Sequence, residues 1–236
     1  MNVRVVPLLA ALVPFLAVHV TYLVAAANGL VDWCNPYIDS CTSISATGRK
    51  PPASYVFRAT MLPAAVIIAA YWWLNYVWLA ELRRRAGGEP AAANRWMLGL
   101  GIVACVGLVL YVTVLGEKGS AWALQRRIGV VLYFSLTFLS QLLLYSQLRR
   151  LRTQLPDLPE ILLQAMWWIC IVLLATGVLT VILQLWDKSW YETVEDAFEW
   201  VLALLLQTNY LQGYFVWRRV GWGLAVHMPP PRSPAD

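Results

Sequence analysis

The chain has 236 residues, of which 60% are hydrophobic and only 13% are charged. Because soluble domains carry about 25% charged residues, this chain has too little polar surface for a water-exposed globule. Its net charge of +5 comes from short arginine clusters at the ends of apolar blocks, which is typical of membrane topology signals and not of a nucleic-acid surface. The sequence therefore predicts an all-α integral membrane protein with no nucleic-acid partner.

Six apolar segments approach the roughly 20 residues that a membrane-spanning helix needs. They are residues 5–27, 55–82, 97–115, 128–148, 161–185 and 197–217. We expect residues 1–220 to form a six-helix transmembrane bundle and 221–236 to form a short cytoplasmic tail with a disordered end from His227. The first apolar run is longer than the 7–15 residues of a signal peptide, which favours a retained helix over a cleaved signal.

The orientation follows from the uneven distribution of Lys and Arg. Of the 18 such residues, eleven fall on the side that holds both termini and seven on the other side. Since the richer side is cytoplasmic, both termini are expected inside, and the first loop, residues 28–54, outside. The membrane is then the plasma or inner membrane in a bacterium, or an endomembrane in a eukaryote.

The first loop contains Cys34 and Cys41, in a compartment that permits disulfides. This favours a bridge between them over two free thiols. Cys105 and Cys170 fall inside predicted helices and are expected to be small buried side chains. The loop continues with a Ser/Thr-rich run to Pro52, whose hydroxyls favour turns. We interpret it as an ordered lid over the mouth of the bundle.

The stretch "SISATGRKPPASYVF" resembles the first-loop signature of the DRAM-like family of membrane proteins. That family includes the damage-regulated autophagy modulators, the yeast Sfk proteins and the Golgi factor that remodels the lipid of GPI anchors. The matching positions are Ile44, Ser45, Gly48, Pro51, Pro52, Val56 and Phe57.

The resemblance extends along the chain to an "AYW" in the second segment and to Arg58, Glu199 and Asn209. Ala46 and Gln141 depart from it, standing where branches of the family have Asp and His. The resemblance implies six helices and work on membrane lipids.

Three ionisable side chains fall within or at the ends of the predicted spans, where such groups raise a functional hypothesis. His19 lies inside the first span, and Arg58 and Glu199 lie at the same depth at the outer ends of the second and sixth. An ion pair between Arg58 and Glu199 beneath the loop is one alternative. The other is that each side chain reaches the interface separately.

The fifth predicted span, residues 161–185, is expected to carry Thr176, Thr180 and Gln184 on one face, since they are spaced at i, i+4 and i+8. Hydrogen bonding between helices is the simpler interpretation, and a polar wall for a lipid headgroup is the sharper one. The neutral amides of the inner half, such as Asn75, Gln141 and Asn209, are interpreted mainly as contacts between helices.

The sequence contains only two histidines, His19 and His227. A catalytic zinc site needs three protein ligands, so we expect no metal and no cofactor. A Ser-His-Asp arrangement would depend on His19, with no acid nearby in the sequence.

The sequence thus favours a protein that binds, organises or helps remodel membrane lipids. Its expected headgroup site is formed by Ser43, Ser45, Gly48, Arg58, Thr176, Thr180, Gln184 and Glu199. One alternative is a lipid-remodelling enzyme that uses His19 or Glu199. The other is a non-catalytic subunit or scaffold with a membrane-protein partner.

Overall fold

The computed structural model describes residues 3–89 and 91–224, and within these ranges the chain forms seven helices and no strand. The helices are α1 (Val5–Ala27), α2 (Ile44–Thr47), α3 (Ala53–Arg85), α4 (Ala92–Thr113), α5 (Ser120–Arg152), α6 (Glu160–Trp186) and α7 (Lys188–Arg219). The expected disordered end, from His227 onward, lies outside the described residues.

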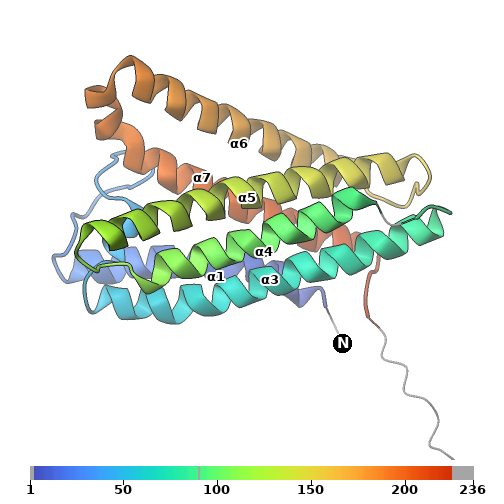
Figure 1. Ribbon diagram of the computed structural model, residues 1–236, viewed down its shortest axis with the longest axis horizontal. Coiled ribbons are helices and arrows are strands. Elements are labelled where there is room, and N and C mark those ends of the chain that lie inside the picture. The colour runs from blue at the N-terminus through green and yellow to red at the C-terminus, as the bar shows by residue number, and fades with distance from the viewer. Residues whose placement is uncertain (1–2, 90, 225–236) are drawn as a thin grey trace, which may run out of the picture.

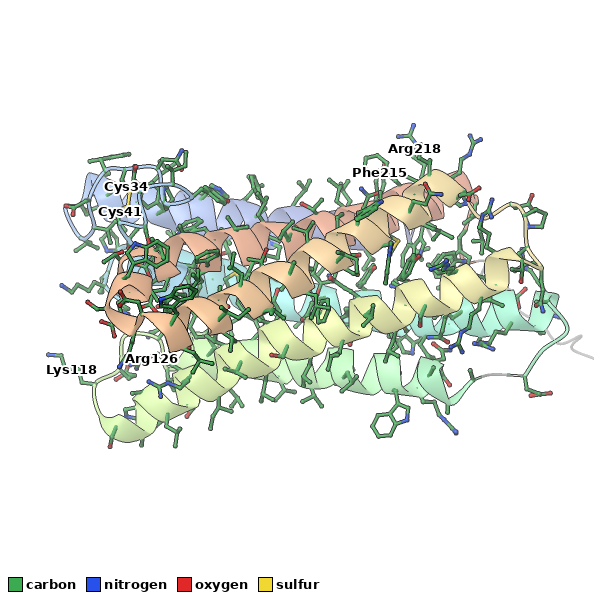
Figure 2. All side chains as sticks on the ribbon, turned by 90° about the horizontal axis from the view of Figure 1, so that it is seen from above. Cys34, Cys41, Lys118, Arg126, Phe215 and Arg218 are labelled. Atoms are coloured by element: carbon green, nitrogen blue, oxygen red, sulfur yellow. A yellow bond between two sulfur atoms is a disulfide. The ribbon has the colours of Figure 1, made fainter. Side chains whose placement is uncertain are left out.

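The six long helices lie side by side and alternate in direction, so each end of the bundle gathers one end of every helix (Figure 1). We call the end where α1 finishes and α3 begins the loop end, because it carries the segment between these helices. We call the other end the arginine end, because α3, α5 and α7 finish there in arginine-rich last turns. Figure 2 shows Cys34, Cys41, Lys118 and Arg126 at the loop end, and Phe215 and Arg218 towards the arginine end.

The helices are neighbours in the order α5, α4, α3, α1, α7 and α6, and α6 returns only loosely to α5. The tightest contact is that of α4 with α5. Gly107 and Gly129 lie at this contact, since a Cβ added at Gly129 would lie 2.6 Å from the Gly107 carbonyl oxygen. Small residues that let two backbones approach in this way are typical of helix contacts in membranes.

Five helices are long and apolar enough to cross a membrane: α1, α3, α4, α5 and α6. An all-α membrane protein is therefore confirmed. The predicted count of six spans is not confirmed by the same criterion, because α7 does not meet it. Its first turns carry charged residues, and its later part carries Gln207, Asn209 and Gln212, so its apolar run is diluted.

Two helices begin well before the predicted apolar segments. Helix α5 begins at Ser120, so Arg126 and Arg127 are helical, and α7 begins at Lys188, so Glu195 and Asp196 are helical too. Apolarity predicts where a helix meets hydrocarbon, but a helix can continue into the interface, where polar side chains reach water. These four charged residues matter for the site described below.

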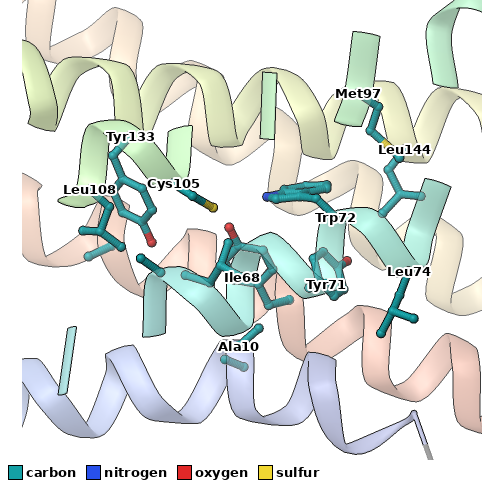
Figure 3. Packing of buried hydrophobic residues seen from close by; sticks show 14 of the residues in the cluster. Ala10, Ile68, Tyr71, Trp72, Leu74, Met97, Cys105, Leu108, Tyr133 and Leu144 are labelled. Carbon is teal, nitrogen blue, oxygen red and sulfur yellow. The ribbon is translucent and has the colours of Figure 1, made fainter. Parts of the chain in front are cut away.

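The middle of the bundle is closed by aromatic side chains. Tyr71 lies edge-on to Trp72 and to Tyr210, with ring centroids 5.0 and 5.1 Å apart, and all three side chains are fully buried (Figure 3). Gly101 makes room for this cluster, because a Cβ there would overlap the Trp72 ring. Edge-to-face rings and close helix contacts pack this region.

Candidate functional site

The first loop is tied to the helices beneath it. Cys34 and Cys41 form a disulfide, as the sequence predicted. The Tyr22 hydroxyl donates to the Cys34 carbonyl oxygen at 2.8 Å and accepts from the Cys34 backbone N–H at 2.8 Å. The Trp200 indole N–H donates to the Thr42 carbonyl oxygen at 2.8 Å. The loop is therefore fastened to both α1 and α7.

His19 belongs to the same attachment. Its Nδ1 lies 2.6 Å from the Phe15 carbonyl oxygen and its Nε2 lies 3.0 Å from the Tyr37 hydroxyl. Because a carbonyl oxygen only accepts, the proton is assigned to Nδ1, and Nε2 accepts from Tyr37. Nδ1 thus fixes the ring within α1, and Nε2 holds the loop through Tyr37.

The Ser/Thr-rich run forms the short helix α2. Ser43 caps it, since its hydroxyl accepts from the Ala46 N–H at 3.1 Å, which is the usual role of serine at a helix start. Arg49 donates to the Ser45 hydroxyl at 3.1 Å. Gly48 lies where a Cβ would come within 2.8 Å of the Phe57 ring. This segment is therefore an ordered floor for the side chains around it.

A cavity of about 620 Å³ opens beside α2 at the loop end, between α5, α6 and α7. We call it the polar cavity. Its polar lining consists of Ser43, Ser45, Arg49, Ser135, Thr180, Tyr191, Glu195, Asp196 and Glu199.

A second cavity of about 300 Å³ adjoins the polar cavity and shares Ser45, Arg49 and Glu199 with it. We call it the arginine cavity, because Arg126 and Arg127 of α5 join Arg49 in its wall. Arg126 donates to the Glu117 carbonyl oxygen at 2.8 Å, which fixes the start of α5.

Tyr111 of α4 also lines the arginine cavity. Its side chain is only 6% exposed, and its hydroxyl has no hydrogen-bond partner in the structure. A buried hydroxyl without a partner costs about 1–3 kcal/mol. Tyr111 therefore presents an unused hydrogen-bonding group at the edge of a cavity.

The carboxylates and arginines of the two cavities face the same open volume without pairing directly. Within residues 3–89 and 91–224, every ion pair of 4 Å or less lies elsewhere, at Glu81 with Arg84 and Arg85, Arg152 with Glu160, and Lys188 with Glu192. These charges still affect one another across the cavity. Burial and the charge of Glu195 raise the pKa of Asp196, one residue before the predicted span, and the charge of Arg49 lowers it.

An apolar groove of about 370 Å³ continues from the polar cavity, with which it shares Phe134, Ser135, Val181 and Leu202. The groove is lined by α5, α6 and α7. It exists because the second half of α6 leans away from the bundle (Figure 1), and no residue after Leu173 in that helix is buried.

Residues 2–214 match the family described as the Frag1/DRAM/Sfk1/Cwh43P N-terminal domain. The chain belongs to this family. The resemblance found in the first loop is therefore confirmed, and with it a multi-pass membrane protein. No curated protein and no solved structure matches the chain.

In this Frag1/DRAM/Sfk1/Cwh43P family member, four of the predicted headgroup residues line one cavity. They are Ser43, Ser45, Thr180 and Glu199.

The other four predicted residues lie apart from the polar cavity. Arg58 donates to the Leu115 carbonyl oxygen at 2.5 Å, and Arg49, not Arg58, shares the cavity with Glu199. Thr176 and Gln184 do not line it, so only the middle residue of that helix face, Thr180, reaches the cavity. Gly48 is occupied by packing.

Sequence reasoning missed Arg49, Arg126, Arg127, Tyr111, Glu195 and Asp196 as site residues. In the sequence the arginines indicate only topology, and the two acids fall outside the predicted sixth span. The sequence did contain a usable signal: two adjacent arginines, Arg126 and Arg127, and two adjacent acids, Glu195 and Asp196, lie near the starts of two helices at the loop end. What could not be seen in the sequence is that α5 and α7 bring these starts to one cavity.

Away from the site, two of the three amides named above contact another helix. Gln141 of α5 donates to the Leu206 carbonyl oxygen of α7 at 3.1 Å, and Asn209 of α7 contacts the Cys170 sulfur of α6 at 3.5 Å. Asn75 instead donates to the Tyr71 carbonyl oxygen of its own helix, α3, at 2.9 Å. Among the described residues, no group of three or more His, Cys, Asp or Glu is arranged to hold a metal ion.

Proposed function

We propose that this protein binds a membrane lipid, with the headgroup in the polar cavity beneath the first loop and an acyl chain in the apolar groove. The observation that carries the proposal is the continuity of the two: a cavity lined by hydroxyls and charges opens directly into a groove lined by aliphatic and aromatic side chains. Ligand sites of this kind match apolar surface to an apolar ligand and place a few polar groups where they fix its orientation.

We also propose that the loop end lies outside the membrane and both termini inside. The arginine-rich last turns of α3, α5 and α7 support this orientation, because arginines next to spans favour the cytoplasmic side. We also propose that α7 is the sixth span. It packs against both α1 and α6, two of the apolar helices, so it shares their course through the bilayer.

The geometry of α6 supports entry of the lipid from the side. Leu174, Val178, Val181 and Ile182 are 49–54% exposed in the second half of this helix, and all line the groove. In a bilayer their exposed surface faces hydrocarbon, which matches a lipid tail. A lipid can thus slide its tail into the groove while its headgroup stays at the membrane surface.

No observation favours the enzyme alternative over binding. His19 has both ring nitrogens hydrogen-bonded, one to the Phe15 carbonyl oxygen of its own helix and one to the Tyr37 hydroxyl of the loop. Glu199 lines the cavity, but no Ser or Cys is hydrogen-bonded to a histidine beside it in the described part of the chain, the arrangement that activates such a nucleophile.

The groove is tested by filling it. Gly177 of α6 lines the groove, and nothing lies within 4 Å of a Cβ added there, so the side chain of Gly177→Trp starts in open space at the groove. Gly99→Trp is the matched control, because Gly99 of α4 also has free space around it and lies away from the groove. The assay is binding of a fluorescent phospholipid to the full-length protein in mild detergent, with native mass spectrometry of the bound species.

We expect Gly177→Trp to weaken lipid binding about tenfold, which corresponds to about 1.4 kcal/mol, and Gly99→Trp to bind like the unmodified protein. Equal binding by the two variants would overturn the groove as the tail site. A stoichiometric co-purified protein without bound lipid would instead favour the subunit alternative.

A further inference from the structure

We propose that the headgroup bound in this site is zwitterionic: a phosphate that carries a cationic amine. This inference rests on the lipid site proposed above and names its headgroup class. The phosphate lies in the arginine cavity, at Arg49, Arg126 and Tyr111. The amine faces the polar cavity, at Glu195, Asp196 and Glu199.

The first argument is the separation of charge. Arg126 and Arg127 line only the arginine cavity, whereas Glu195 and Asp196 line only the polar cavity. The two cavities adjoin through Arg49 and Glu199. Arg126 and Arg127 therefore stand on one side of a continuous space and Glu195 and Asp196 on the other, with Arg49 and Glu199 between them. This arrangement complements a ligand with both charges a short distance apart.

The second argument is that the protein does not neutralise these charges itself. None of the ion pairs of 4 Å or less within the described ranges involves Arg49, Arg126 or a carboxylate of the site. Arg49 donates to a serine hydroxyl and Arg126 to a backbone carbonyl oxygen. Because a guanidinium has five N–H donors, both keep donors for a phosphate.

The third argument is Tyr111. Its hydroxyl is buried and has no partner, and its side chain lines the arginine cavity beside Arg49 and Arg126. A phosphate oxygen in that cavity accepts a hydrogen bond from it. Tyr111 therefore marks the side of the site at which a hydrogen-bond acceptor is missing.

Ligands with only one charge fit less well. An anionic headgroup without an amine leaves three carboxyl groups facing a negative ligand, and like charges brought together in a partly buried site disfavour binding. A simple cation leaves three arginines uncompensated. A soluble phosphoamine has the right headgroup but leaves the apolar groove unused, so the lipid form is the one that matches the whole site.

The test compares three probes on the full-length protein in mild detergent. They are a short-chain phosphatidylethanolamine, a phosphatidylglycerol with the same chains, and free phosphoethanolamine. We expect the first to bind about tenfold more tightly than phosphatidylglycerol, which lacks the amine and so loses one charge-assisted interaction. We expect a similar difference from phosphoethanolamine, which lacks the acyl chains that would fill the groove. Equal or tighter binding of phosphatidylglycerol overturns the zwitterionic assignment, and equal binding of phosphoethanolamine overturns the assignment to a lipid.

Variants separate the two halves of the headgroup. Arg126→Gln should weaken both lipids about tenfold, because both carry the phosphate. The double variant Glu195→Gln with Asp196→Asn should weaken only the amine-bearing lipid. Lys118→Gln and Glu192→Gln are the controls, since both residues are exposed at the loop end and line neither cavity.

The outcomes distinguish this inference from the proposed function. If the double variant changes neither lipid while Gly177→Trp still weakens both, the lipid site stands and the amine assignment fails. If neither lipid binds and Gly177→Trp changes nothing, the lipid site itself fails. Tyr111→Phe adds a check: it should weaken both lipids and leave the melting temperature unchanged or raised, because it removes an unpaired hydroxyl.

Discussion

The two halves of α6 have similar sequences and different surroundings. Both are almost wholly apolar, yet all four buried residues of this helix, from Leu163 to Leu173, lie in its first half. The second half is largely uncovered by the other helices, and its last residue, Trp186, is 87% exposed. Apolarity therefore brings a helix into the membrane but does not decide whether it closes against its neighbours.

A similar contrast holds between the middle of the bundle and its loop end. From the middle towards the arginine end, polar side chains bridge helices at short range: Asn94 donates to the Tyr76 carbonyl oxygen at 2.9 Å, and Ser140 to the Met97 carbonyl oxygen at 3.2 Å. At the loop end, polar groups line the two open cavities instead, and a further cavity of about 840 Å³ opens at the arginine end, between the start of α6 and the end of α7. The closed middle and the open loop end can be tested separately.

The largest effect on stability is expected from the disulfide at the loop end. Replacing Cys34 and Cys41 by Ser frees a short closed loop, which by chain entropy costs about 2.5 kcal/mol. We expect the melting temperature in detergent to fall by about 5–10 °C. A reductant should lower the melting temperature of the unmodified protein to the same value, and no change in either case would show that the hydrogen bonds from Tyr22 and Trp200 hold the loop alone.

The same two cysteines report the orientation. In intact cells, after treatment with a reductant that does not cross membranes, an impermeant maleimide should label Cys34 and Cys41, because the loop lies outside. Labelling that appears only after the cells are opened would reverse the proposed orientation. The buried Cys105 and Cys170 are expected to stay unlabelled in both cases.

A smaller loss of stability is expected from overpacking the aromatic cluster in the middle of the bundle. In Gly101→Ala the added methyl group overlaps the Trp72 ring, and relief of such an overlap costs about 2 kcal/mol, within the usual range for overpacked cores. Gly99→Ala is the control on the same helix, with free space around it. We expect thermal unfolding to occur about 4–8 °C lower for Gly101→Ala, with lipid affinity unchanged when measured well below the transition. If both variants unfold at the same temperature, the middle of the bundle is less closed than it appears.

The smallest effect is expected at His19. In His19→Phe the ring is kept, but the bonds to Phe15 and Tyr37 are lost, at a cost of about 1 kcal/mol. The measurement is again the melting temperature, with Leu23→Phe on the exposed side of α1 as the control. If phospholipid turnover were detected and abolished by His19→Phe without a loss of stability, the enzyme alternative would replace the structural role given to His19 here.

The sequence predicted much of this architecture for physical reasons that are local. Long apolar runs specify spanning helices, a Ser before a short helix specifies its cap, and two cysteines in a polar loop pair. The site was predicted only in part, because it depends on angles between helices. Thr180 lines the cavity and Thr176 does not, although they share one helix face, because the position of the cavity along α6 depends on how that helix packs against α5 and α7. The ion pair between Arg58 and Glu199 was one of two alternatives open by depth alone, but the Leu115 carbonyl oxygen holds Arg58 instead.

For the lipid site that we propose, the tilt of α6 has a consequence for which lipids can be told apart. A sealed pocket measures the length of an acyl chain, because a chain that is too long has nowhere to go. The groove beside α6 is open along its side, so a tail lying in it touches protein on one face and other lipids on the opposite face. Such a site reads the chemistry at the membrane surface and is indifferent to the number of carbons or double bonds beneath it.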